Sequence, residues 1–153
     1  QFEKIQNLIQ AGIEEGANLV AGGPDRPDGL DKGYFVRPTI FSDVTNDMKI
    51  FYEETFGPVA PLIKFSTEEE VIKMANDTNY GLAGYFYSRD IGRIYRVAEA
   101  LEYGMIGVNA GVISTEVAPF GGIKESGIGR EGAAEGIDEY LETKYIMVAG
   151  IDT

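Results

Sequence analysis

The chain has 153 residues, a length typical of a single domain. Its composition, 44% hydrophobic and 25% charged, indicates a globular protein rather than a disordered one. The net charge of −12 disfavours nucleic acid and anionic lipid as partners, because phosphate binding needs clustered lysine and arginine. No apolar run reaches the roughly 18 residues of a membrane-spanning helix, so we expect no membrane insertion.

Cysteine and histidine are both absent from the sequence. Their absence excludes disulfides, cysteine or histidine metal sites, and any serine–histidine or cysteine–histidine catalytic pair within this chain. We therefore expect no metal. Residues 1–4 show no signal-peptide pattern, which favours a cytoplasmic location.

The first half of the chain is predicted to begin with a helix. Apolar residues recur at helical spacing over 2–13, and Gly16 stands where a helix-ending glycine is expected. Glycine, proline and aspartate then predict a loop. In order, we expect a helix over 2–15, a strand over 18–21, the loop 22–33, an extended segment over 34–41 and a short helical turn that carries Glu53 and Glu54.

The second half alternates strands with helices. Thr67 followed by Glu70 is the pattern of a capping box, and Asp90 is expected to cap a further helix. In order, we predict a strand over 59–65, a helix after Thr67 with a buried face of Val71, Ile72 and Ala75, a strand over 82–87, a helix after Asp90 that Gly104 ends, and a strand over 105–108. This alternation predicts an α/β fold with a parallel open sheet and crossover helices.

Residues 109–129 lack periodicity and are rich in glycine. A loop of about twenty residues is too long for a simple connection and is usually functional. A short helix over 131–140 and a last strand over 143–148 are predicted to follow. An exposed strand near a terminus invites pairing with another chain.

Two adjacent carboxylates, Glu53 and Glu54, run directly into Phe56, Gly57 and Pro58. Pro58 restricts the residue before it and ends any preceding helix. An acid pair at such a corner is held in place and aimed; the alternative is a pair that only solvates a turn.

Two stretches carry a resemblance to a known family. E-E-x-F-G-P-V at 53–59 and P-F-G-G-x-K-x-S-G-x-G-R-E at 119–131 resemble the aldehyde dehydrogenase superfamily, and the chain looks like the C-terminal part of such an enzyme. The resemblance implies three parts: the C-terminal part of the catalytic domain (1–125), a glycine-rich segment and short helix that pack on the coenzyme domain (126–141), and an oligomerisation strand and tail (142–153).

The same resemblance implies roles for four residues. Glu54 would accept hydrogen bonds from the ribose hydroxyls of NAD or NADP, since two vicinal hydroxyls are two donors, and Phe56 would lie against the ribose and nicotinamide. Phe120 would form the aromatic wall of the aldehyde pocket, or instead be a core residue that anchors a glycine loop. The spelling I-S-x-E-V-A-P-F-G-G looks most like succinate-semialdehyde dehydrogenases, in which the serine that matches Ser114 binds the substrate's distal carboxylate. Alternatively, Ser114 bonds its own backbone in a turn.

Residues 127–132 fit G-x-G-x-x-G, but we reject a dinucleotide fingerprint because polar residues, not a strand, are expected before it. Lys124 and Arg130 are predicted to form ion pairs or to bond loop carbonyls, without a catalytic role.

Two functions are compatible with these patterns. The first is a fragment of an NAD(P)-dependent aldehyde dehydrogenase that oxidises an aldehyde, above all succinate semialdehyde, through the thioester of a cysteine outside this chain. Glutarate semialdehyde, lactaldehyde and betaine aldehyde stay open as substrates. The second is a non-catalytic module that binds or assembles with dehydrogenase subunits. In either case we predict no catalytic residue in this chain, no turnover by the chain alone, and a homodimer or homotetramer formed through the C-terminal strand.

Overall fold

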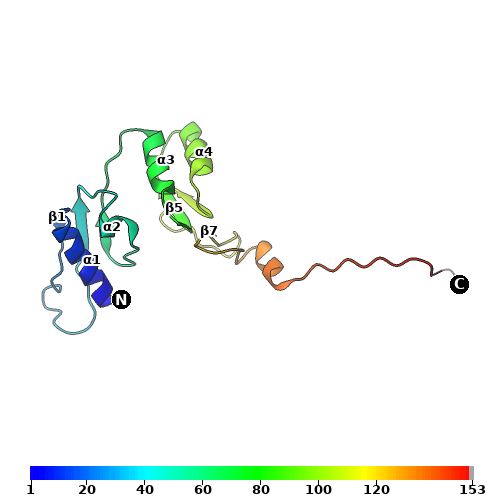
Figure 1. Cartoon of the computed structure of the whole chain (residues 1–153), viewed down its shortest axis with the longest axis horizontal. Coiled ribbons are helices and arrows are strands. Elements are labelled where there is room, and N and C mark those ends of the chain that lie inside the picture. The colour runs from blue at the N-terminus through cyan, green and yellow to red at the C-terminus, as the bar shows by residue number, and fades with distance from the viewer. Residues whose placement is uncertain (152–153) are drawn as a thin grey trace. The chain divides into compact units, whose positions relative to one another are not determined.

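The computed structural model describes residues 1–151, which fold as two compact units. The first unit is Gln1–Ser66, and the second unit begins at Thr67. This division was not predicted, and the boundaries expected at 125/126 and 141/142 stay predictions. Residues 152 and 153, the end of the expected tail, lie outside the described residues. Figure 1 shows the elements of each unit along the chain.

The first unit packs two helices against a small mixed sheet. Its elements are α1 (Phe2–Glu14), β1 (Asn18–Ala21), β2 (Thr39–Ser42), α2 (Lys49–Tyr52) and β3 (Val59–Pro61). Strand β2 lies in the centre, antiparallel to β1 and parallel to β3. The core consists of buried apolar side chains from α1, β2, α2 and the links between them: Ile5, Leu8, Ile9, Ala17, Phe41, Val44, Met48 and Ile50.

The predicted first helix and first strand are confirmed. The apolar stripe of α1 faces the core, as the helical spacing requires. Gly16 has φ +96°, a left-handed conformation that an alanine would adopt only with strain, and the N–H of Ala17 donates to Gly12 O at 2.9 Å. No atom lies within 4 Å of a Cβ built on Gly16, so steric crowding does not require glycine here. Glycine is favoured at this helix end because of its backbone conformation.

The other predictions for the first unit need correction. Helix α2 ends at Tyr52, so Glu53 and Glu54 follow the helical turn instead of lying on it. The extended segment forms a strand only from Thr39, directly after Pro38, which has no N–H to donate. The predicted strand over 59–65 is assigned only over Val59–Pro61.

The second unit holds most of the predicted alternation. Its elements are α3 (Glu68–Asn76), β4 (Tyr80–Gly81), β5 (Ala83–Phe86), α4 (Ile91–Ala100), β6 (Met105–Val108), β7 (Ile123–Lys124) and a 3₁₀ helix, η1 (Glu135–Tyr140). Strands β5 and β6 are parallel and joined by α4, whereas β4 and β7 are antiparallel. The α/β class is thus confirmed, but the described strands form two small sheets here and one in the first unit, where one open sheet was expected.

Both predicted helix caps are present. Thr67 Oγ1 accepts a hydrogen bond from the N–H of Glu70 at 3.1 Å, and Asp90 Oδ1 accepts one from the N–H of Arg93 at 2.7 Å. The Arg93 bond lowers the pKa of the Asp90 carboxyl below its ordinary value. Two details differ from expectation. The face of α3 formed by Val71, Ile72 and Ala75 is half-buried, not buried, and α4 ends at Ala100, before Gly104.

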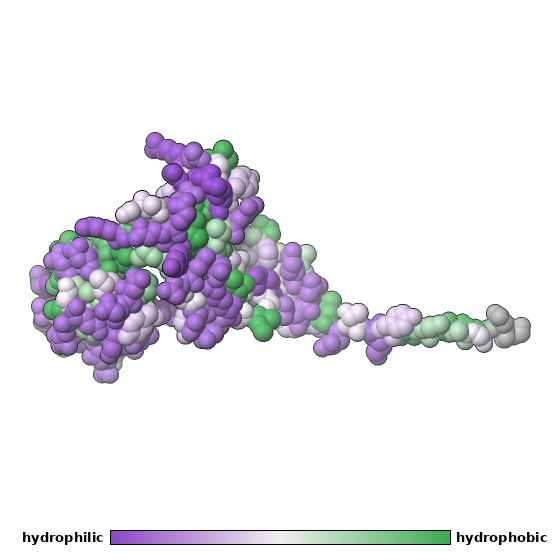
Figure 2. Space-filling model, turned by 45° about the horizontal axis from the view of Figure 1, so that its top comes forward, coloured by the Kyte–Doolittle hydropathy of each residue, from purple (hydrophilic) through white to green (hydrophobic). Residues whose placement is uncertain are grey.

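The described chain alone forms no strand over 143–148, and the predicted pairing of this segment with another subunit stays a prediction. Residues 143–148 have no strand assignment, because no described segment pairs with their backbone, and the helix before them is a 3₁₀ helix shorter than predicted. Apolar side chains along this segment face solvent (Figure 2): Tyr145 is 84% exposed and Met147 is 74% exposed.

Among the described residues, no helix is long and apolar enough to cross a membrane.

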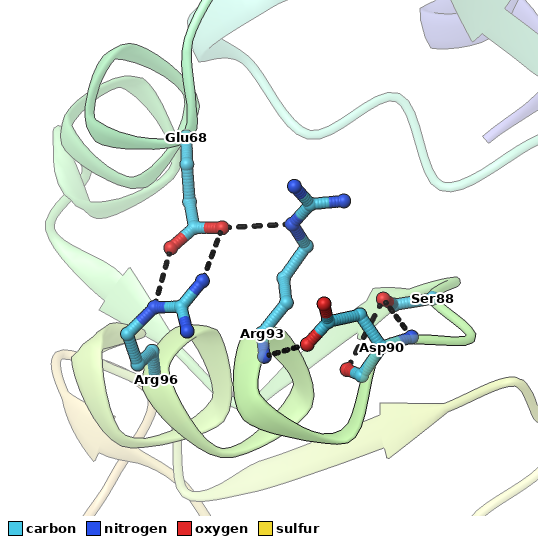
Figure 3. A network of polar contacts seen from close by, with 5 residues as sticks. All are labelled: Glu68, Ser88, Asp90, Arg93 and Arg96. Carbon is cyan, nitrogen blue, oxygen red and sulfur yellow. Dashed lines mark hydrogen bonds and ion pairs between the residues drawn. The ribbon is translucent and has the colours of Figure 1, made fainter.

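Glu68 joins the two long helices of the second unit (Figure 3). Its carboxylate accepts hydrogen bonds from Arg93 Nε at 2.8 Å, from Arg96 Nε at 3.1 Å and from Arg96 Nη2 at 3.2 Å. The bonds from Arg96 and then Arg93 lower the pKa of the Glu68 carboxyl below its ordinary value. The contact between α3 and α4 is therefore strongest when this carboxyl is ionised.

Replacement of Glu68 by glutamine is expected to lower the urea midpoint of the second unit at neutral pH, since both arginines lose their charged partner. A lowered native pKa contributes stability that is complete above the ordinary value of 4.5 and is lost as the pH falls through the native value. The difference in midpoint between wild type and Glu68→Gln should therefore shrink below pH 4.5. Glu69→Gln, which removes a carboxylate from the same helical turn, is the control; a Glu68→Gln difference independent of pH would contradict the assignment.

Candidate functional site

The corner after α2 is tied to two other elements of the first unit. The side-chain amide of Gln1 donates to the backbone oxygens of Thr55 and Phe56, at 2.8 and 3.0 Å. The N–H of Thr39, the first residue of β2, donates to Pro58 O at 2.8 Å. Residues 53–58 are thus fixed against the start of α1 and the edge of β2, as the sequence predicted for this corner.

Glu54 and Phe56 present their side chains to solvent from this fixed corner. Phe56 is 77% exposed, and its backbone has φ +47°. Gly57 lies close against α1, since a Cβ built on it would be 2.5 Å from Ile5 Cδ1. An exposed carboxylate two residues from an exposed flat ring, on a fixed turn, can bind a group that has both hydroxyls and a planar face.

The glycine-rich loop of the second unit is closed by backbone and arginine contacts. The backbone groups of Phe120 and Glu131 exchange two hydrogen bonds, at 2.8 and 2.7 Å. The guanidinium of Arg130 donates to Gly122 O at 2.9 Å and to Gly129 O at 2.7 Å. Arg130 therefore binds loop carbonyls, as predicted, and holds the two arms of the loop together.

This loop and η1 surround an open cavity of about 850 Å³. Phe120 is half-buried and lines it, together with Leu82 from the link before β5. The remaining lining residues are Gly121, Gly122, Ser126, Gly127, Ile128, Gly129, Arg130, Glu131, Gly132, Ala133, Gly136, Ile137, Glu139 and Tyr140. Ser114 is exposed and is not among these described lining residues, so the structure does not bring Ser114 and Phe120 to one cavity.

Lys124 anchors the same loop to the C-terminal end of α3. Its ammonium donates to Asn76 O at 3.0 Å and Thr78 O at 3.1 Å, and pairs with the Glu102 carboxylate at 2.5 Å. This confirms the predicted structural role. The rejected glycine fingerprint at 127–132 follows the two-residue antiparallel strand β7 and opens no α-helix in the described chain.

Asn109 was not singled out by the sequence. It follows β6 directly, has φ +55°, and forms two side-chain hydrogen bonds with the backbone of Ser88. The available signal was an asparagine at the carboxyl end of a predicted parallel strand, where side chains at functional sites gather. Among the described residues, no cluster of three or more histidine, cysteine, aspartate or glutamate side chains could hold a metal ion.

The sequence of the chain matches a known family over nearly its whole length. The sequence profile of the aldehyde dehydrogenase family matches residues 1–146. The chain belongs to the aldehyde dehydrogenase family. The family resemblance predicted from residues 53–59 and 119–131 is thereby confirmed.

Three relatives show how close and how partial the similarity is. 3-Sulfolactaldehyde dehydrogenase of Pseudomonas putida is 54% identical over 149 residues, covering 97% of this chain and 30% of that protein. The mitochondrial succinate-semialdehyde dehydrogenase of Oryza sativa is 53% identical over 150 residues, covering 98% and 28%. The NADP(+) succinate-semialdehyde dehydrogenase of Escherichia coli is 54% identical over 145 residues, covering 95% and 30%.

A solved structure agrees with these matches. An aldehyde dehydrogenase of Mycobacterium tuberculosis complexed with NAD+ has a TM-score of 0.92 and 42% identity, covering all of this chain and 31% of that one. The chain thus spans less than a third of the length of these relatives. NAD or NADP is the coenzyme of relatives in this family, as the names of the M. tuberculosis and E. coli proteins state.

Proposed function

We propose that this chain is the C-terminal part of an NAD(P)-dependent aldehyde dehydrogenase that oxidises a semialdehyde, succinate semialdehyde above others, to the acid. The observation that carries the proposal is identity of 53–54% with relatives named for succinate semialdehyde, glutarate semialdehyde and 3-sulfolactaldehyde. These aldehydes share an anionic group distant from the carbonyl. A cytoplasmic location is part of the same proposal.

The residues of the first unit fit the coenzyme's nicotinamide ribose. Glu54 is exposed on a corner that Gln1 and Thr39 hold, so its carboxylate can accept from two vicinal hydroxyls, while the exposed ring of Phe56 offers a face for the planar base. The bound coenzyme supplies the hydride acceptor. This chain's own residues orient it.

The residues of the second unit are assigned to the substrate. The Ser114 hydroxyl donates a hydrogen bond to the distal carboxylate, and Phe120 forms an aromatic wall for the aldehyde. The nucleophilic cysteine lies outside this chain, which contains none. The isolated chain therefore turns over no aldehyde.

The second candidate is a non-catalytic module that binds or assembles with dehydrogenase subunits. The absence of cysteine from this chain is compatible with it. The two candidates separate when the longest protein that carries this sequence is purified and assayed with succinate semialdehyde and either NAD or NADP. Reduction of the coenzyme supports the enzyme, and a protein whose mass equals that of this chain, with no turnover, supports the module.

Ser114→Ala in the full-length enzyme is expected to raise the KM for succinate semialdehyde about tenfold, because a hydrogen bond to a charged group contributes roughly 1.5–3 kcal/mol. The KM for butanal, which has no distal carboxylate, should stay within about twofold of wild type. Initial rates with both aldehydes give the comparison. Equal losses on the two substrates would mean that Ser114 shapes its loop and does not bind the carboxylate.

Deletion of residues 143–153 in the full-length enzyme is expected to dissociate a homodimer or homotetramer into a smaller folded species. The proposal rests on the exposed apolar side chains of the described tail, which gain burial and backbone partners by adding to another subunit's sheet. Sedimentation velocity at several concentrations measures the change. An oligomer of unchanged size after deletion would refute the role of the tail.

A further inference from the structure

Asn109 begins the long loop that carries Ser114. It follows β6 directly, and its backbone N–H donates to Phe86 O, at the end of β5, at 3.0 Å. Strands β5 and β6 are parallel, so their carboxyl ends meet at the same edge. The φ of +55° turns the chain away from the sheet immediately after β6.

The side chain of Asn109 joins this edge to a second loop. Its Oδ1 accepts a hydrogen bond from the N–H of Ser88 at 2.9 Å, and its Nδ2 donates to Ser88 O at 2.7 Å. Ser88 Oγ accepts in turn from the N–H of Asp90 at 3.2 Å, and Asp90 caps α4 (Figure 3). The start of the Ser114 loop is therefore fixed to the frame of β5 and α4.

A second contact fixes the loop next to Ser114. A Cβ built on Gly107, in β6, would lie 2.9 Å from Ile113 Cγ2 and 2.5 Å from Tyr85 Cδ1. The side chains of Ile113 and Tyr85 thus occupy the space that a larger residue at 107 would need. Ile113 is half-buried and Ser114, the next residue, is exposed. Residues 109–114 are thus held at Asn109 and at Ile113, directly before the exposed Ser114.

We propose that Asn109 is a positioning residue for recognition of the substrate's distal carboxylate. Its two bonds to Ser88, together with the contact of Ile113 on Gly107, place the Ser114 hydroxyl. A hydroxyl bond is directional, and misplacement by about 1 Å in a binding site can reduce rates on the order of a hundredfold. The inference rests on the proposed function of Ser114, and it adds the residue through which that serine is oriented.

Asn109→Gly is the decisive variant, because glycine adopts positive φ freely and the change removes only the two side-chain bonds. Asn76→Ala is the matched control. The Asn76 side chain also bonds two backbone groups, Ala100 O and the N–H of Glu102, each at 2.8 Å, but at the end of α3. In the full-length enzyme, Asn109→Gly should raise the KM for succinate semialdehyde about tenfold and leave the kcat and KM for butanal within about twofold, whereas Asn76→Ala should not change the ratio of the two KM values.

The double variant Asn109→Gly with Ser114→Ala tests whether Asn109 acts through Ser114. The double variant should bind succinate semialdehyde no worse than Ser114→Ala alone. The inference is overturned if the two substitutions raise the KM for succinate semialdehyde by factors that multiply in the double variant. It is also overturned if Ser114→Ala raises that KM selectively while Asn109→Gly leaves it unchanged. Asn109→Asp keeps the acceptor for Ser88 N–H but loses the donor, so an intermediate KM is expected, and this variant serves if Asn109→Gly does not fold.

Hydrogen exchange on this chain separates failure of the inference from failure of the proposed function. Asn109→Gly should accelerate exchange in peptides covering 110–118, while Asn76→Ala leaves these peptides at the wild-type rate. If exchange accelerates but Ser114→Ala is unselective, the carboxylate assignment of Ser114 is wrong, and with it the inference for substrate recognition. Unchanged exchange in Asn109→Gly overturns the positioning role itself.

Discussion

Replacement of Gly104 by alanine is expected to lower the free energy of unfolding of the second unit by about 3 kcal/mol or more, the upper range for inserting a methyl group into a packed region. A Cβ on Gly104 would lie 2.0 Å from Gly121 O and 2.9 Å from Gly122 Cα. All these atoms belong to the backbone, so no side chain can rotate out of the way. The N–H of Gly104 also donates to Gly81 O at 2.9 Å, which holds Gly104 against the β4 segment.

Gly111→Ala is the matched control for this steric effect. A Cβ on Gly111 has no atom within 4 Å, and its backbone φ lies outside the left-handed region. We expect this substitution to change the free energy of unfolding by less than about 0.5 kcal/mol. Urea unfolding followed by circular dichroism measures both variants. Equal urea midpoints for Gly104→Ala and Gly111→Ala would contradict the prediction, since the backbone at 121–122 would then move away from residue 104 without loss of stability.

Glu54→Gln in the full-length enzyme is expected to weaken coenzyme positioning or slow hydride transfer about tenfold or more, since charge-assisted hydrogen bonds become neutral while the side-chain shape is kept. The fold should be unaffected, because Glu54 is exposed and the corner is held by the backbone oxygens of Thr55, Phe56 and Pro58. This expectation rests on the proposed ribose contact.

Single-turnover reduction of NAD and NADP, with a direct titration of coenzyme binding, measures the effect. Glu53→Gln is the control, since the N–H of Glu53 closes α2 by donating to Lys49 O at 2.9 Å and its carboxylate is given no coenzyme contact. A Glu54→Gln enzyme with wild-type coenzyme affinity and transfer rate would contradict the assignment, and equal losses in both variants would indicate a general effect of charge.

Elements with local signals were predictable from the sequence. The apolar stripe and Gly16 gave α1 nearly to its last residue, and the oxygens of Thr67 and Asp90 marked the starts of α3 and α4. Each signal acts within a few residues, so a single sequence contains it completely. The corner at Pro58 was predictable for the same reason, because proline fixes its own backbone.

Features that depend on a distant partner were not predictable in this way. The strand expected over 143–148 has the right side chains but no backbone partner among the described residues. Gly104 was expected to end a helix, and Gly121 and Gly122 only to belong to a glycine-rich loop. None of the three has a positive φ, and each makes a close approach to another backbone segment. Strand pairing and close backbone approach each involve two segments, and the sequence of one segment does not identify its partner.

The candidate site divides along the same line. Glu54, Phe56, Ser114 and Phe120 were found through motifs, and their roles stay proposals. Asn109 was missed because its role depends on the backbone of Ser88, which lies far away in the sequence. Only the structure shows that Asn109 and Ser88 lie side by side. The structure does not bring Ser114 and Phe120 to one cavity.

The left-handed backbone of Phe56 lowers the stability of the fold while it presents the side chain to solvent. A left-handed conformation costs a bulky L-residue roughly 1–2 kcal/mol, and Phe56, which is 77% exposed, recovers little of this by burial. In a directed-evolution experiment, selection for heat resistance alone would therefore favour glycine at position 56. Under the proposed coenzyme contact of Phe56, selection for turnover of the full-length enzyme would retain the aromatic residue. Libraries under the two pressures should diverge at this corner, even though the surrounding turn is the same in both.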